Sequence, residues 1–82
     1  MNLDKICAVI KKKLTLKKIY ISKYDNNITI TAIGNFFIGM NSLEKQKNIY
    51  KILMPYFIKK EIHAIKIHTY TISEWNQKKS HT

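Results

Sequence analysis

The sequence predicts an α+β fold in which helices cover one face of a three-stranded sheet. Apolar residues recur at helical spacing in two segments and alternate with other residues in three shorter ones, and turn residues separate these segments. The 82 residues suffice for one domain. A chain this short buries only about 60% of the surface that its unfolded form exposes, which disfavours a deep enzymatic pocket.

The first predicted helix covers residues 2–14, where apolar side chains recur at helical spacing: Leu3, Ile6, Cys7, Ile10 and Leu14. Asn2 can cap the start of this helix, and the lysines of its last turn suit the helix dipole. Cys7 lies on the apolar stripe, so we interpret it as a small buried hydrophobe rather than a reactive thiol. It is the single cysteine, so no intramolecular disulfide can form.

Two strands are predicted next, at residues 16–24 and 27–33, because isoleucines alternate with other residues in both. Asp25 and Asn26 between them have turn chemistry, which predicts a hairpin. Residues 63–71 are the third predicted strand, and residues 73–75 close a single domain over residues 1–76. The polar residues 77–82 are predicted to be a disordered tail.

A glycine-bounded loop at residues 34–42 precedes the second predicted helix, for which Asn41 and Glu44 have capping-box spacing. Its apolar stripe is predicted to hold six residues: Leu43, Gln46, Tyr50, Leu53, Met54 and Phe57. Pro55 is predicted to end this helix and to start a short one over residues 56–60. The resulting order, αββααβ, matches the type II KH arrangement, but residues 34–39 lack the GxxG spacing that clamps nucleic acid in KH domains.

The net charge is +10, and all 15 basic residues are lysine. A basic domain favours an anionic partner such as nucleic acid, whereas the lack of arginine disfavours base-specific readout. An equally good explanation is an A/T-rich genome, because the codons of lysine, isoleucine and asparagine are all A/T-rich.

Several classes of protein are disfavoured by what the sequence lacks. There is no GxSxG, CxxC, HExxH or P-loop motif, and the acidic residues are scattered, so we expect no enzyme. Asp4 and Lys5 interrupt any secretory h-region. No apolar run approaches the roughly 18 residues that span a membrane. We therefore expect a cytoplasmic protein without a membrane partner.

The segment 37-FIGMNSLEKQKNIY-50 resembles the signature of the BolA-like protein family, with five residues at the family's spacing: Phe37, Gly39, Lys45, Gln46 and Tyr50. The segment 61-EIHAIKIHTYTISEW-75 resembles the family's C-terminal strand. The resemblance covers residues 3–75 and is strongest to the short bacterial IbaG branch. It implies a BolA-like, type II KH-like fold.

The resemblance also implies a partner, a monothiol glutaredoxin with its glutathione, and a 2Fe–2S cluster shared between the two proteins. His63 corresponds to the family's C-terminal metal ligand, and a second ligand comes from the loop between the first two strands. In that loop Asn27 stands where the related branch has a histidine, and Asp25 is the other possible donor. His68 lies on the opposite face of an ideal strand from His63. The isolated chain is expected to hold no cofactor.

An alternative function is a basic nucleic-acid-binding regulator, since gene regulation and stress response form a second theme of the family. Lys45, Lys47 and Lys51 of the second helix would then contact the phosphates of DNA. A solvated helix face, or a patch for an acidic partner protein, explains these lysines as well. We expect a monomer or a weak homodimer.

Overall fold

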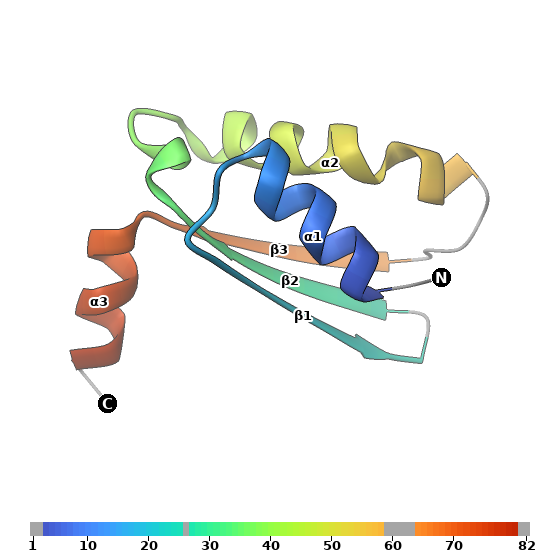
Figure 1. Cartoon of the computed structure of the whole chain (residues 1–82), viewed down its shortest axis with the longest axis horizontal. Helices are drawn as coiled ribbons and strands as arrows, with labels where there is room; N and C mark the ends of the chain where they lie inside the picture. Colours follow the sequence, from blue (N-terminus) through green and yellow to red (C-terminus); the bar gives the residue numbers. More distant parts are fainter. Residues whose placement is uncertain (1–2, 26, 59–63, 81–82) are drawn as a thin grey trace.

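The computed structural model of the chain describes residues 3–25, 27–58 and 64–80. Its elements, in order, are α1 (Leu3–Lys13), β1 (Lys18–Tyr24), β2 (Asn27–Ile33), the 3₁₀ helix η1 (Asn35–Phe37), α2 (Ser42–Ile58), β3 (Ala64–Tyr70) and α3 (Ile72–Ser80). The predicted α+β class with a three-stranded sheet is confirmed (Figure 1). No helix within the described residues has the length and apolar character needed to cross a membrane.

The sheet has the strand order β1-β2-β3, so β2 is the central strand. β1 pairs with β2 in antiparallel orientation, and β2 pairs with β3 in parallel orientation. A parallel pair needs a crossover connection, which here contains η1 and α2. The sheet thereby brings the start of β3 beside the start of β2, although a whole helix separates them in sequence.

The predicted hairpin between β1 and β2 is confirmed. Tyr24 pairs with Asn27, which leaves a two-residue turn between the strands. Asp25 has a φ of 58°, the left-handed conformation that the favoured two-residue hairpin turns require and that Asp tolerates better than most residues.

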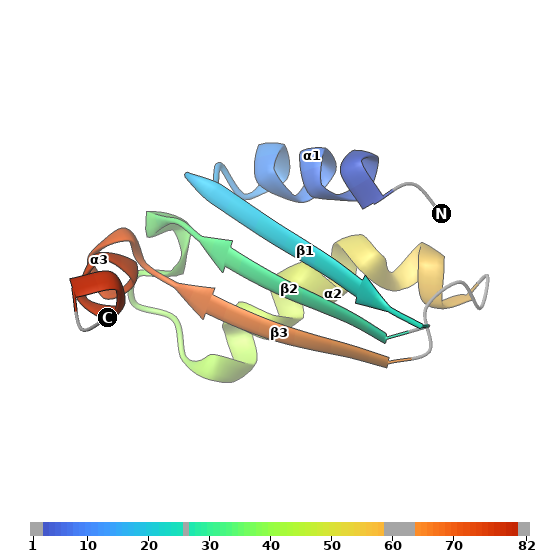
Figure 2. The same ribbon diagram turned by 90° about the horizontal axis from the view of Figure 1, so that it is seen from below.

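The hydrophobic core lies between the sheet and the two long helices, α1 and α2, which share one face of the sheet (Figures 1 and 2). Alternation along β2 directs three side chains into this core, where they meet residues from α1, η1 and α2. The core residues with the least exposed surface are Ile6, Ile10, Ile28, Ile30, Ala32, Phe37, Ile49 and Leu53.

The predicted apolar stripe of α2 was wrong in part. Leu43 and Met54 are 63% and 52% exposed, whereas Ile49 and Leu53 are buried. Ile52 and Tyr56 pack against the same core, so the buried stripe is rotated relative to the predicted one. Both sets of residues keep helical spacing, and the position of the sheet decides which set is buried. The side chain of Phe57 lies outside the described residues.

The predicted helix break at Pro55 was also wrong, because α2 runs without interruption from Ser42 to Ile58. Proline removes the hydrogen bond to the carbonyl four residues earlier, that of Lys51. Pro55 and Lys51 are both exposed, so water can satisfy this carbonyl. The helix therefore tolerates the proline on its solvent side.

Residues 72–80 form a third helix where the sequence analysis expected a closing turn and, from residue 77, a disordered tail. Thr71 and Glu74 form a reciprocal capping box at its start. The backbone N–H of Thr71 donates to Glu74 Oε1 at 2.8 Å, and that of Glu74 donates to Thr71 Oγ1 at 3.2 Å. The helix lies at one end of the sheet (Figure 1).

Candidate functional site

Asn27, which the resemblance points to as a second ligand position, lies at the same end of the sheet as the first residue of β3, Ala64. In the parallel register of β2 and β3, Asn27 pairs with Ala64, and Asn27 also pairs with Tyr24 across the hairpin. His63 lies outside the described residues, and it directly precedes Ala64 in the sequence. The end of the hairpin at Asn27 and the first residue of β3 are therefore neighbours.

The hairpin turn supplies oxygen donors. Asp25 and Asn27 are both exposed, so the carboxylate and the amide are accessible. Among the residues that the structure describes, no group of three His, Cys, Asp or Glu side chains could hold a metal ion. Iron–sulfur clusters are held by thiolates and, in some centres, by imidazoles. The turn by itself therefore does not fit a cluster.

A hollow of about 430 Å³ lies between the beginnings of β2 and β3 and is lined by Asn27, Ile28, Thr29, Ala64, Ile65 and Lys66. It contains the pair Asn27–Ala64 and lies beside the hairpin turn. This end of the molecule can thus admit part of a partner beside the predicted ligand positions.

His68, the described histidine, lies away from this end of the sheet. It pairs with Thr31 in the middle of the sheet and is exposed. With a strand rise of about 3.3 Å per residue, it lies about 13 Å along β3 from Ala64. The prediction that His63 and His68 do not share a metal stays a prediction, because His63 is not described.

The motif residues have different roles in the fold. Phe37 is fully buried, and its ring packs edge-on against Phe36 with the centroids 5.7 Å apart. Gly39 has a φ of +81°, which glycine adopts without strain. Gln46 is exposed and Tyr50 is half-buried on α2. Phe37 and Gly39 therefore shape the loop that leads into α2, whose N-cap is the side chain of Asn41.

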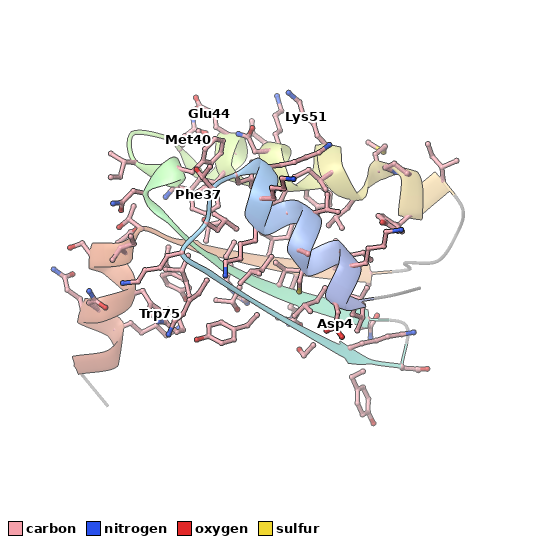
Figure 3. All side chains as sticks on the ribbon, viewed as in Figure 1. Asp4, Phe37, Met40, Glu44, Lys51 and Trp75 are labelled. Atoms are coloured by element: carbon pink, nitrogen blue, oxygen red, sulfur yellow. The ribbon has the colours of Figure 1, made fainter. Side chains whose placement is uncertain are left out.

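The three lysines of α2 do not form one uniform patch. Lys47 and Lys51 are exposed and one helical turn apart, and Lys51 points away from the sheet (Figure 3). Lys45 is half-buried and lies close enough to α3 for its charge to act on Glu74. The pKa of Glu74 is lowered mainly by its hydrogen bonds from the backbone and side chain of Thr71, and the charge of Lys45 adds to this effect.

Cys7 is half-buried on α1. Burial raises the pKa of its thiol, and the carboxylate of Asp4 raises this pKa further. A protonated thiol is a poor nucleophile and a poor metal ligand, so Cys7 has the properties expected of a packed residue.

A ring cluster that was not predicted from the sequence lies on the other side of the sheet from α1 and α2. The ring of Trp75 packs 5.9 Å from that of Tyr20 and 5.3 Å from that of Tyr70. Nζ of Lys78 lies 4.8 Å from the centroid of Tyr70 and 2.8 Å from its hydroxyl. The signal available in the sequence was the capping-box pattern Thr71-x-x-Glu74, which predicts a helix start at this point.

Comparison with known proteins gives consistent matches over most of the chain. A family model described as BolA-like protein matches residues 11–74. A protein of Buchnera aphidicola subsp. Schizaphis graminum is 43% identical over 77 residues, 94% of this chain and 96% of that protein. The acid stress protein IbaG of Escherichia coli is 33% identical over 75 residues, 92% and 89% of the two chains. The solved structure of BolA1 from Arabidopsis thaliana has the same fold, with a TM-score of 0.75 at 19% identity, covering 87% of this chain and 92% of that one.

Proposed function

Because this chain belongs to the BolA-like protein family, we propose that it is a non-catalytic accessory protein that pairs with a monothiol glutaredoxin. The pair would take part in binding, transferring or sensing an iron–sulfur cluster. The single observation that carries this proposal is the register of β2 and β3, which places Asn27 opposite Ala64, the residue after His63.

His63 is the proposed ligand of this chain. The partner would supply its own thiolate and that of glutathione, and the imidazole would replace a thiolate on one iron. Imidazole ligation raises the reduction potential of a 2Fe–2S centre. Asp25 and Asn27 at the hairpin turn offer oxygen atoms rather than a thiolate or an imidazole. We therefore propose that this chain contributes one strong ligand, His63, rather than two.

The ligand role of His63 is tested by producing the full chain together with a monothiol glutaredoxin and glutathione. Visible absorption reports the cluster, and size-exclusion chromatography reports the complex. We expect His63→Ala to keep the complex and to lose or shift the visible absorption, and His68→Ala to behave as wild type because His68 lies on the middle of the sheet. A coloured complex that forms equally well without His63 would disprove the ligand assignment. Failure of the wild-type proteins to associate would disprove the pairing itself.

The position of Asn27 supports a second test. Asn27→His would put an imidazole on the exposed first residue of β2, opposite the residue that follows His63. We expect slower loss of visible absorption when the complex is challenged with an iron chelator. Ser22→His, at an exposed position farther along β1, is the matched control and should leave this rate unchanged. Equal rates in both variants and in wild type would contradict a site at the hairpin turn.

DNA binding through the lysines of α2 stays an alternative prediction. Titration of DNA binding against salt concentration tests it, because phosphate contacts release counterions and make affinity fall with salt. A slope near zero would remove this alternative.

A further inference from the structure

The face of the sheet opposite α1 and α2 carries exposed rings that the proposed function does not use. We call it the outer face, and it consists of the strand residues that alternate with the core-facing isoleucines. Figure 2 looks onto this side of the sheet, with α2 behind the strands and α3 at one end. Most of the outer face is thus open to solvent.

Exposed rings lie along the outer face. Tyr24 is 85% exposed and Tyr20 is 47% exposed. The register aligns Tyr20, Thr31 and His68 in one row across the three strands. The exposed imidazole of His68 on β3 is therefore at the opposite end of this row from Tyr20 on β1. Tyr20 and Tyr24 are four residues apart on one strand face, about 13 Å at the usual rise. The rings therefore present separate stacking surfaces along and across the sheet.

The helix α3 closes one end of this face. Trp75 packs against Tyr20 and Tyr70, and in Figure 3 it lies on the side of the sheet away from α1 and α2. This packing fixes the ring of Tyr20 and leaves about half of its side chain exposed. A ligand on the outer face would thus extend from Tyr20 towards Tyr24, away from α3.

The charge of the outer face has one sign. Lys18 and Lys66 lie on it, and Lys78 lies beside Tyr70 at its end. The outer-face positions of the three strands contain no Asp or Glu, and the whole chain carries +10. A second copy of the chain would bring the same lysines, so self-association through this face is disfavoured. The exposed rings favour a ligand with flat rings that can stack on them, and the lysines favour a polyanion. Nucleic acid has both properties.

We propose that the outer face binds a single strand of nucleic acid, with bases stacked on Tyr20, Tyr24 and His68 and phosphates near Lys18 and Lys66. Platforms of this kind combine aromatic stacking with basic side chains and tolerate many base sequences. An all-lysine surface gives phosphate attraction without base readout, which agrees with sequence tolerance. This site is separate from the lysines of α2. It reaches the hairpin end through Tyr24, which pairs with Asn27, and through Lys66, which lines the hollow there, but it requires neither a glutaredoxin nor a cluster.

The test uses the full chain and labelled oligouridylate and oligodeoxythymidylate of about ten nucleotides, within the usual site sizes of such platforms. Fluorescence anisotropy gives the affinity, and the fluorescence of Trp75, the single tryptophan, reports stacking beside Tyr20. We expect binding and quenching with single strands, and weaker binding to a duplex, whose base faces are already stacked. Stronger binding to the RNA than to the DNA would indicate contacts with the 2′-hydroxyl.

Two matched pairs of variants locate the site. Tyr24→Ala should weaken binding roughly 5- to 150-fold, which is the usual effect of losing one stacked base, whereas Tyr24→Phe should retain it. Lys66→Gln should lower the slope of log affinity against log salt by about 0.7, the value for one phosphate contact with a single strand. Lys47→Gln, at an exposed position of α2, the helix that covers the other face of the sheet, should change neither the affinity nor its salt dependence.

Three results would overturn this proposal. One is that neither oligonucleotide binds at low salt. Another is that Tyr24→Ala binds as tightly as wild type, because that side chain is too exposed for the substitution to act through folding. The third is that Lys47→Gln weakens binding as much as Lys66→Gln, which would move the site to α2.

Discussion

The two glycines of this chain are required for different physical reasons. A Cβ on Gly34 would lie 2.9 Å from Cδ2 of Leu16, closer than Cβ contacts in proteins, and 3.1 Å from its Cα, tighter than most of them. A Cβ on Gly39 would meet nothing within 4 Å, but its φ of +81° disfavours every side chain. Gly34 is required because a side chain would have no room there, and Gly39 is required because its backbone conformation disfavours a side chain.

We therefore predict different responses to substitution at these positions. Gly34→Ala should lower the free energy of unfolding by about 1–3 kcal/mol through overpacking, because the added Cβ would press against both the buried side chain and the backbone of Leu16. Gly39→Ala should lower it by about 1–2 kcal/mol through backbone strain. Urea denaturation measures both effects, as midpoint shifts at constant slope.

A further substitution separates the two causes. Asn tolerates the left-handed region better than Ala does, so Gly39→Asn should recover part of the loss at that position. Gly34→Asn adds more volume and should be worse than Gly34→Ala. Equal losses for Ala and Asn at both positions would contradict this assignment of causes.

At the scale of elements, the capping box of α3 makes the stability of this helix depend on pH. Its hydrogen bonds lower the pKa of Glu74 in the folded chain relative to the unfolded one. The stabilisation is fully present above the unfolded pKa and is lost as the pH falls through the folded pKa. We predict that α3 loosens in acid, measured by the fluorescence of Trp75 between neutral pH and the acid range.

Glu74→Gln isolates this effect. The amide oxygen of Gln can still accept the hydrogen bond from the Thr71 N–H, so only the charge near the helix start is lost. Stability at neutral pH should therefore fall by about 0.3–1 kcal/mol at most, and the acid response of Trp75 should flatten. Glu44→Gln, in the first turn of α2, is the matched control, since Trp75 packs on β1 and β3 rather than on α2. An acid response that persists unchanged in Glu74→Gln would show that another group causes it.

The elements also show how far the sequence could predict the fold. The strands and their hairpin were predicted within one or two residues, because alternation and turn chemistry are local signals. The buried stripe of α2 was predicted only in part, because two sets of residues on that helix share helical spacing. Among the predicted residues whose side chains the structure describes, Leu53 alone is fully buried. The helix α3 was missed because short helices are stabilised mainly by packing, here that of Trp75, which the linear sequence does not show.

At the scale of the molecule, Phe37 joins the loop after β2 to the core. Its side chain is fully buried in the cluster that also contains Ile6, Ile30 and Ile49. We predict that Phe37→Ala lowers the free energy of unfolding by about 3–5 kcal/mol, a large part of the 5–15 kcal/mol that is typical of folded domains. Chemical denaturation measures the loss.

The neighbouring Ile38 is the control for this experiment, because it is 64% exposed. Ile38→Ala should stay within about 0.5 kcal/mol of wild type, as is usual for surface positions. If both substitutions lowered the free energy of unfolding equally, the loss at Phe37 could not be assigned to its burial in the core.

The candidate site was less predictable than the fold. The pairing of Asn27 with Ala64 follows from the parallel register, which depends on the crossover through α2 and cannot be deduced from either strand alone. The ring cluster joins Tyr20 of β1 to Tyr70 and Trp75, which lie about fifty residues later on β3 and α3. The sequence indicated which residues were candidates for the site. The pairing of strands in the folded chain determined which of these candidates are neighbours.

The strand order β1-β2-β3 leaves two edge strands that could pair with other chains at high protein concentration. In the sheet that the structure describes, β1 and β3 are edge strands, and unpaired edges are templates for pairing with strands of other chains. β1 carries Lys18 and Lys23, and β3 carries Lys66, so each edge bears a charge that must be desolvated before another strand can add. Lysine on edge strands is a common protection against aggregation. The lysine-rich composition thus helps to keep a small open sheet from growing into a larger one.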